Sequence, residues 1–147
     1  MSDLAPFFSP AGVAIIGAST NPNKLSHGIL KNMKLYGFEG GIYPVNPKAD
    51  AILDLEAFPD VSEVPDPVDL AVVVLPAPMT PDILRSCGER GIKAVIIISG
   101  GFREVGGSGV KLEEECRQIA QSYGMRLIGP NCVGTLDLYT GLNTTFI

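Results

Sequence analysis

The stretch VAIIGAST, residues 13–20, decides the fold, because a short apolar run ends there in a loop of small residues. Further apolar runs cover residues 42–45, 70–75, 94–98 and 125–128, and each is followed within two residues by glycine or proline. Most of the runs are rich in valine, isoleucine and leucine without polar alternation. This pattern is typical of strands that are buried on both faces of a parallel sheet.

Three stretches between these runs carry apolar residues at helical spacing: 29–36, 83–87 and 112–123. We expect Thr80 to be the N-cap of the second helix, and the acids at 113–115 to lie at the start of the third, where the macrodipole favours them. Residues 49–68 contain three prolines and are expected to form an irregular crossover. Alternating strands and helices predict an α/β fold, doubly wound, with a mainly parallel sheet of about five strands.

Length and composition limit the class of protein. The 147 residues predict one domain, residues 1–147, and the abrupt end at Ile147 suggests that it is the N-terminal domain of a longer protein. The net charge of −5 argues against nucleic acid, and no apolar run approaches the ~20 residues that span a membrane. Three cysteines without a CxxC pair argue against a disulfide framework or a metal site and fit a cytoplasmic protein.

The distribution of charge favours an anionic ligand near the N-terminus. Residues 1–54 hold four lysines and four acids, so the whole negative excess lies in the remainder of the chain. A small-residue loop after the first strand lets ligand phosphates approach backbone N–H groups, and the next helix N-terminus adds partial positive charge. The alternatives are ordinary solvated lysines and a plain turn from strand to helix.

The other strand ends also carry candidate site residues. The second strand ends in YPVNPK, residues 43–48, without the carboxylate by which NAD enzymes hold a ribose. Lys48 would suit a phosphate on the ribose, or it is a turn lysine without a partner. The prolines of 76–79 are expected to form a rigid, extended lip. The single histidine, His27, is interpreted as a bystander or a loop contact, and Cys132 as a structural thiol, so we predict no catalytic residue.

Taken in order, these loops resemble the CoA-binding domain of the NDP-forming acyl-CoA synthetases, the superfamily that includes the succinyl-CoA synthetase α subunit. The matching pieces are GAS at 17–19, YPVNPK at 43–48, DLAVVVLPA at 69–77, GIKAVIIISGGFRE at 91–104 and RLIGPNCVG at 126–134. The closing LNTTF, residues 142–146, resembles the acetate–CoA ligase (ADP-forming) branch. Each motif is weak alone, but the ordered set covers nearly the whole chain.

The resemblance implies a Rossmann-like domain that binds coenzyme A. The residues implied to face the CoA phosphates are Gly17, Ala18, Ser19 and Thr20, with Lys48 near the ADP portion. From the distribution of charge, we expect Lys24 as well as Lys48 to pair with the CoA phosphates. Those implied to line the path of the adenine and pantetheine are Pro76, Ile98, Ser99 and Gly100, and Asn131 and Cys132 would lie near the thiol. The succinyl branch has a glutamate where this chain has Gly100, and Glu104 is not an obvious replacement.

The resemblance also implies partners. In these enzymes a phosphohistidine-bearing domain and an ATP-grasp domain or subunit complete the reaction, with ATP/ADP and Mg in the full-length enzyme only. This chain contains neither module, so we expect the isolated chain to be inactive as a ligase. A free-standing CoA-binding protein without catalysis and the leading segment of a synthetase-like acyltransferase fusion are the alternatives. An NAD-dependent oxidoreductase is the least favoured.

Overall fold

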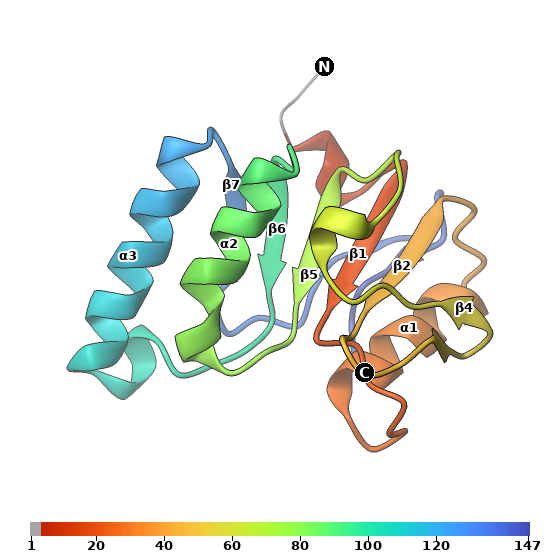
Figure 1. The fold of residues 1–147 in the computed structure, drawn as a ribbon, viewed down its shortest axis with the longest axis horizontal. Helices are drawn as coiled ribbons and strands as arrows, with labels where there is room; N and C mark the ends of the chain where they lie inside the picture. The colour runs from red at the N-terminus through yellow and green to blue at the C-terminus, as the bar shows by residue number, and fades with distance from the viewer. Residues whose placement is uncertain (1–3) are drawn as a thin grey trace.

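The computed structural model describes residues 4–147 and is built around one parallel sheet (Figure 1). The sheet has five strands in the order β2-β1-β5-β6-β7, with bounds Gly41–Val45, Gly12–Ile16, Leu70–Val73, Ala94–Ile97 and Arg126–Ile128. Each strand coincides with one of the apolar runs. The Rossmann-like, doubly wound fold that the sequence predicts is therefore confirmed.

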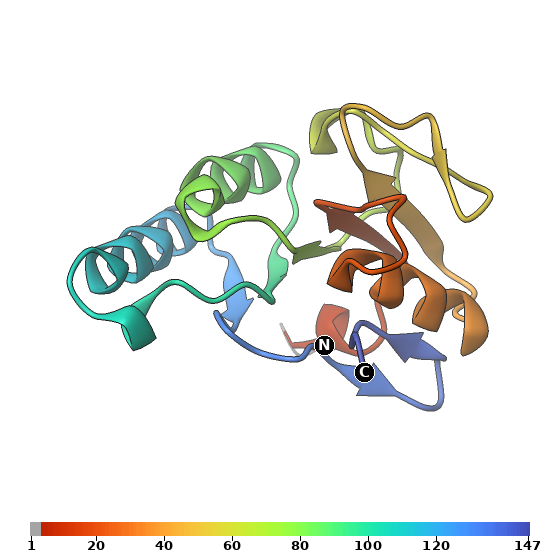
Figure 2. The ribbon, with the colours of Figure 1, turned by 90° about the horizontal axis from the view of Figure 1, so that it is seen from below.

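Three helices cover the two faces of this sheet (Figure 2). Helix α1 spans Leu25–Leu35 and lies on one face, while α2, Thr80–Glu89, and α3, Ser108–Ser122, lie side by side on the other. Strand β1 shows why its sequence has no polar alternation. Its Val13 and Ile15 pack into the core beneath α1, and its Ala14 and Ile16 pack into the core beneath α2 and α3.

The crossover from β2 to β5 contains no α-helix. It holds a short hairpin of β3, Ala51–Ile52, and β4, Leu55–Glu56, followed by the 3-10 helix η2 at Val61–Glu63. The sequence predicted an irregular crossover here but not the hairpin. The turn residues Leu53 and Asp54 have positive φ values of 50° and 63°. Glycine is the usual sign of such a turn in a sequence, and this turn contains none.

A second hairpin near the C-terminus was also missed by the sequence analysis. Strands β8, Leu136–Asp137, and β9, Leu142–Asn143, pair antiparallel, and Leu142 is buried in the core on the α1 face. The following segment is tied to α1, because the Asn32 side-chain amide donates to the carbonyl of Thr145 at 2.8 Å. The 3-10 helix η1, Ala5–Phe7, adds the buried ring of Phe7 to the same core.

Two expectations about the helix starts and one about a loop were wrong. Thr80 is the first residue of α2 rather than its cap, because the 3-10 helix η3, Ala77–Met79, runs directly into α2. Only Pro76 is therefore extended, and the predicted rigid lip is a helical turn. Helix α3 begins at Ser108, so the acids at 113–115 lie beyond its first turn and pair with arginines instead.

Candidate functional site

The carboxyl ends of the parallel strands meet at one edge of the sheet, onto which Figure 2 looks. In open sheets of this kind ligands bind at that edge, where the strand order reverses. Here the strand order reverses between β1 and β5, and a cavity of about 420 Å³ opens there on the face that α2 covers. We call it the β1–β2 cavity; it is lined by Ile16, Gly17, Ala18, Ser19, Val45, Asn46, Pro47, Lys48, Pro59, Asp60, Val61, Leu75, Met79, Ile83 and Ser86.

Backbone and side-chain hydrogen bonds join the loops after β1 and β2 into one wall of this cavity. The N–H groups of Gly17 and Ala18 both donate to the carbonyl of Val45 at 3.2 Å. The side-chain amide of Asn46 donates to the Ala18 carbonyl at 2.8 Å, and its oxygen accepts the Lys48 N–H at 2.7 Å. The two loops are thus held together, with Lys48 exposed at the mouth.

Gly17 allows the loop after β1 to pack closely against the residues that follow β5. Its φ is 92°, and a Cβ at this position would lie 2.2 Å from the carbonyl oxygen of Val74. Both the backbone conformation and the lack of space therefore require glycine. The residue therefore lets the loop after β1 turn tightly beside the end of β5.

The next two N–H groups of this loop are free to bind an anion. Within residues 4–147, the backbone N–H groups of Ser19 and Thr20 have no protein acceptor. The Ser19 carbonyl accepts from Nδ1 of His27 at 2.9 Å, which makes His27 a loop contact, one of the two roles expected. Thr20 and Lys24 are exposed in the same loop, outside the lining of the cavity.

A second hollow, of about 350 Å³, lies at the ends of β6 and β7. We call it the β6–β7 hollow; it is lined by Arg103, Glu104, Glu113, Gly129, Pro130 and Asn131. The Asn131 N–H donates to the carbonyl of Ser99 at 3.0 Å, which joins the two strand ends. The Cys132 thiol donates to the carbonyl of Ile97 at 3.3 Å, and burial raises its pKa, as suits a structural thiol.

Glu104 lies beside Gly100, a neighbour that nothing in the sequence led us to expect. A Cβ on Gly100 would lie 3.1 Å from a carboxylate oxygen of Glu104 and 3.3 Å from the side-chain oxygen of Asn131. Glu104 thus places its carboxylate beside the space that a side chain at position 100 would occupy. The sequence concealed this, because the turn that folds Glu104 back onto the loop is set by hydrogen bonds to backbone N–H groups.

The structure brings some of the predicted site residues together and separates others. Gly17, Ala18, Ser19 and Lys48 line one cavity, whereas Asn131 lines the β6–β7 hollow beside Ser99 and Gly100. Pro76 is exposed between the two. Ile98 has its side chain in the core on the α1 face, 4% exposed, so a ligand would meet only its backbone.

Sequence reasoning missed the apolar wall of the β1–β2 cavity. Met79 and Ile83 are four residues apart on η3 and α2, and Val61 reaches the cavity from η2. The spacing of Met79 and Ile83 was the only available signal, and it does not reveal which face points to a ligand. Among residues 4–147, no group of three metal-ligating side chains gathers, and no helix is both long and apolar enough to cross a bilayer.

The fold and the cavity at its switch point define a Rossmann-like ligand-binding domain. A family model described as a CoA binding domain matches residues 11–137, and the chain belongs to this family. It is 46% identical to the α subunit of acetate–CoA ligase [ADP-forming] II of Pyrococcus furiosus over 142 residues. That match covers 96% of this chain and 31% of the subunit, so the chain spans about a third of the relative's length.

Solved structures agree with this assignment. The dinucleotide-forming acetyl-coenzyme A synthetase 1 of Ca. Korarchaeum cryptofilum, solved with phosphate and ADP, superposes with a TM-score of 0.95 at 44% identity. The superposition covers 99% of this chain and 31% of that one. A conserved hypothetical protein of Pyrococcus furiosus superposes with a TM-score of 0.66 at 29% identity, covering 79% of this chain and 90% of its own.

Proposed function

We propose that this CoA-binding domain holds the phosphate-rich end of coenzyme A in the β1–β2 cavity and serves an ADP-forming acyl-CoA ligase of the acetate–CoA ligase type. The observation that carries the proposal is the combination, in one cavity and the loop beside it, of free backbone N–H groups, an exposed lysine and an apolar wall. Each part of this cavity suits a different part of one ligand.

The loop after β1 suits the phosphates. The N–H groups of Ser19 and Thr20 have no protein partner, and α1 begins a few residues later at Leu25. Backbone donors and a helix N-terminus both favour negative charge. Lys48 at the mouth, with Lys24 beyond it, adds positive charge where the phosphates would enter.

The opposite wall suits the adenine ring. It is formed by the apolar side chains of Val61, Met79 and Ile83, and Met79 is 49% exposed although it is large and apolar. A flat aromatic base would cover this exposed surface. Ligand sites of this kind combine apolar walls with a few well-placed polar groups.

The rest of the ligand would cross the sheet edge toward β7. From β2 to β7 there are four strand spacings, about 19 Å at roughly 4.8 Å each. Pro76, Ser99 and Gly100, with the backbone of Ile98, would lie along this path, and Asn131, followed by Cys132, would lie at its far end. An extended molecule with phosphates at one end and a thiol at the other fits this arrangement.

Relatives of about three times this length support a role as part of a larger enzyme, in which residues 1–147 would be the N-terminal domain. A phosphohistidine-bearing domain and an ATP-grasp domain or subunit, with ATP/ADP and Mg, would then supply the remaining chemistry. The phosphohistidine would belong to that other domain, since His27 lies in the loop after β1, where its Nδ1 donates to the Ser19 carbonyl. The three free cysteines suit a reducing compartment such as the cytoplasm.

A free-standing CoA-binding protein without catalysis is the second candidate. It is favoured by the short Pyrococcus furiosus hypothetical protein, of which this fold covers 90%. Both candidates predict binding of CoA by the isolated chain and no synthesis of acetyl-CoA. They differ in whether a phosphohistidine domain and an ATP-grasp module stimulate turnover.

Calorimetric titration with CoA and with NAD tests the binding. We expect CoA to bind and NAD to bind weakly or not at all, because no carboxylate follows β2 to hold a ribose. Incubation with ATP, magnesium, acetate and CoA should yield no acetyl-CoA. Absence of binding at millimolar CoA would overturn the proposal. Binding of NAD at micromolar concentration would contradict the assignment of CoA, rather than a dinucleotide, as the ligand.

A further inference from the structure

Two side chains converge over Gly100 at the carboxyl end of β6. A carboxylate oxygen of Glu104 lies 3.1 Å from the position of a Cβ on Gly100, and the side-chain oxygen of Asn131 lies 3.3 Å from it. Gly100 is itself exposed, and both side chains line the β6–β7 hollow. The missing side chain of Gly100 therefore leaves a space open to solvent that two polar oxygens approach.

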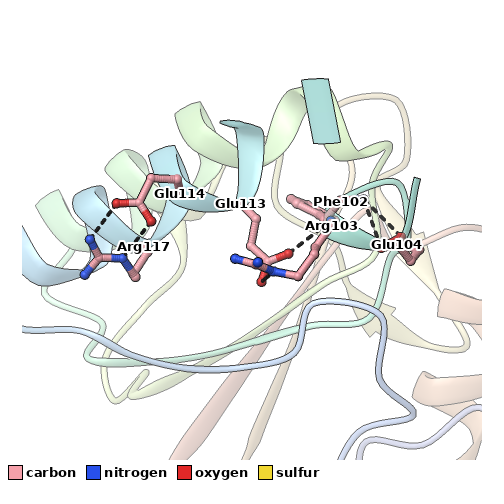
Figure 3. Close-up of polar contacts among 6 residues, drawn as sticks. All are labelled: Phe102, Arg103, Glu104, Glu113, Glu114 and Arg117. Atoms are coloured by element: carbon pink, nitrogen blue, oxygen red, sulfur yellow. Dashed lines mark hydrogen bonds and ion pairs between the residues drawn. The ribbon is translucent and has the colours of Figure 1, made fainter. Parts of the chain in front are cut away.

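The carboxylate of Glu104 is fixed in place by the backbone of its own loop. It accepts the N–H of Phe102 at 3.0 Å and also that of Gly101, and Figure 3 shows it folded back onto Phe102. These donors hold the pKa of Glu104 below its ordinary value, so the group is charged at neutral pH. The next N–H, that of Arg103, donates to Glu113 at 3.0 Å.

This strand end is the electrostatic opposite of the end of β1. Three successive N–H groups, those of residues 101–103, are taken up by carboxylates, whereas the N–H groups of Ser19 and Thr20 are free. The hollow contains two carboxylates, Glu104 and Glu113, against one guanidinium, that of Arg103. A phosphate would be repelled there, but an N–H donor would find acceptors.

We propose that Glu104 determines the direction in which the ligand lies: its carboxylate, with the side chain of Asn131, accepts hydrogen bonds from amide N–H groups of the neutral arm of CoA as this passes over Gly100. By its charge, Glu104 also keeps the phosphates at the β1–β2 cavity. This proposal rests on the proposed function. It assigns the β6–β7 hollow to an uncharged, amide-bearing chain and excludes a phosphate from it.

The substitution Glu104→Gln tests this role, because glutamine keeps the size and an oxygen that can still accept the N–H groups of the loop. The ligands are CoA and adenosine 3′,5′-bisphosphate, which has the phosphates but no arm. We expect Glu104→Gln to weaken the binding of CoA about five- to tenfold, since a hydrogen bond to a charged acceptor is stronger than one to a neutral acceptor. The binding of the bisphosphate should not change. Glu89→Gln, an exposed glutamate at the end of α2, is the matched control and should change neither.

A second variant tests the path independently of charge. Gly100→Ala places a methyl group in this space, so close to Glu104 and Asn131 that both side chains must move slightly to admit it. It should weaken the binding of CoA but not that of the bisphosphate. The melting temperatures of both variants verify that they fold. Equal binding of CoA by wild type and Glu104→Gln, or an equal loss of both ligands, would overturn the role of Glu104. Failure of the wild type to bind either ligand would instead contradict the proposed function.

Discussion

The side-chain amide of Asn46 donates to the carbonyl oxygen of Ala18 across 2.8 Å, and this contact adds a side-chain link to the backbone hydrogen bonds that join the loops after β1 and β2. The oxygen of the same amide accepts the Lys48 N–H, so the position of the lysine depends on the loop after β1. The β1–β2 cavity is therefore one hydrogen-bonded unit rather than two adjacent turns. Disturbing either partner should affect both the phosphate loop and the lysine.

Asn46→Asp removes the donor to Ala18 and keeps the acceptor for Lys48. Two acceptors then face each other, so we expect a loss of about 1–3 kcal/mol in the free energy of unfolding and at least tenfold weaker CoA binding. Denaturant unfolding and calorimetry measure the two effects. Asn32→Asp is the control, because Asn32 makes the same kind of bond to Thr145 away from the cavity. Asn32→Asp should lower the stability but leave the affinity for CoA unchanged. A loss of CoA affinity as large as that of Asn46→Asp would contradict the proposed coupling between Asn46 and the cavity.

Lys48→Ala should weaken the binding of CoA about five- to thirtyfold. This is the equivalent of about 1–2 kcal/mol for a charge-assisted contact at the partly exposed mouth of the β1–β2 cavity. Added salt should weaken the wild type more than the variant, because screening acts on the charge pair. Stability should hardly change, since Lys48 is an exposed turn residue. Lys31→Ala, on the exposed side of α1, should leave CoA binding unaltered. Indistinguishable titrations of wild type and Lys48→Ala at low and moderate salt would remove Lys48 from the site.

Gly17→Ala should destabilise the protein far more than Gly37→Ala. Both glycines have positive φ, 92° and 73°, and share the conformational cost of about 1–2 kcal/mol. Only at Gly17 does the new Cβ also meet the Val74 carbonyl, at 2.2 Å, whereas nothing lies within 4 Å at Gly37. Melting temperatures compare the two variants. Similar losses would mean that the loop after β1 can shift without cost.

The three cysteines should differ in reactivity between the folded and unfolded chain. Burial raises the pKa of Cys87 to about 12 and that of Cys116 to about 11, so at pH 8 the thiolate of Cys116 is about one part in a thousand. The half-buried Cys132 also has a raised pKa. A disulfide reagent at pH 8 should therefore modify the folded protein slowly and all three thiols rapidly in denaturant. The rate for the folded protein should rise with pH, and rapid modification of Cys87 before unfolding would contradict its burial.

The sequence predicted the secondary structure of the sheet because its signals are local. A strand buried on both faces needs a continuous apolar run, as at Val13–Ile16, and the helix after it needs an apolar stripe, as at 29–36. The ordered loops also pointed to the family. The short hairpins were missed because two-residue strands are stable only when packed against the finished fold, and the turn at Leu53 and Asp54 carries no glycine to mark it.

The sequence by itself determined the α/β class, the five parallel strands and the residues that follow them. Only the tertiary structure decided which of these strand ends meet. Gly17 and Lys48 share one cavity because β1 and β2 are neighbours in the sheet, and Met79 and Ile83 reach it because α2 covers that face. Glu104 comes to lie over Gly100 because backbone N–H groups at the end of β6 attract its carboxylate. Contacts of this kind depend on strand order and backbone direction, and neither can be predicted from the spacing of residues along the chain.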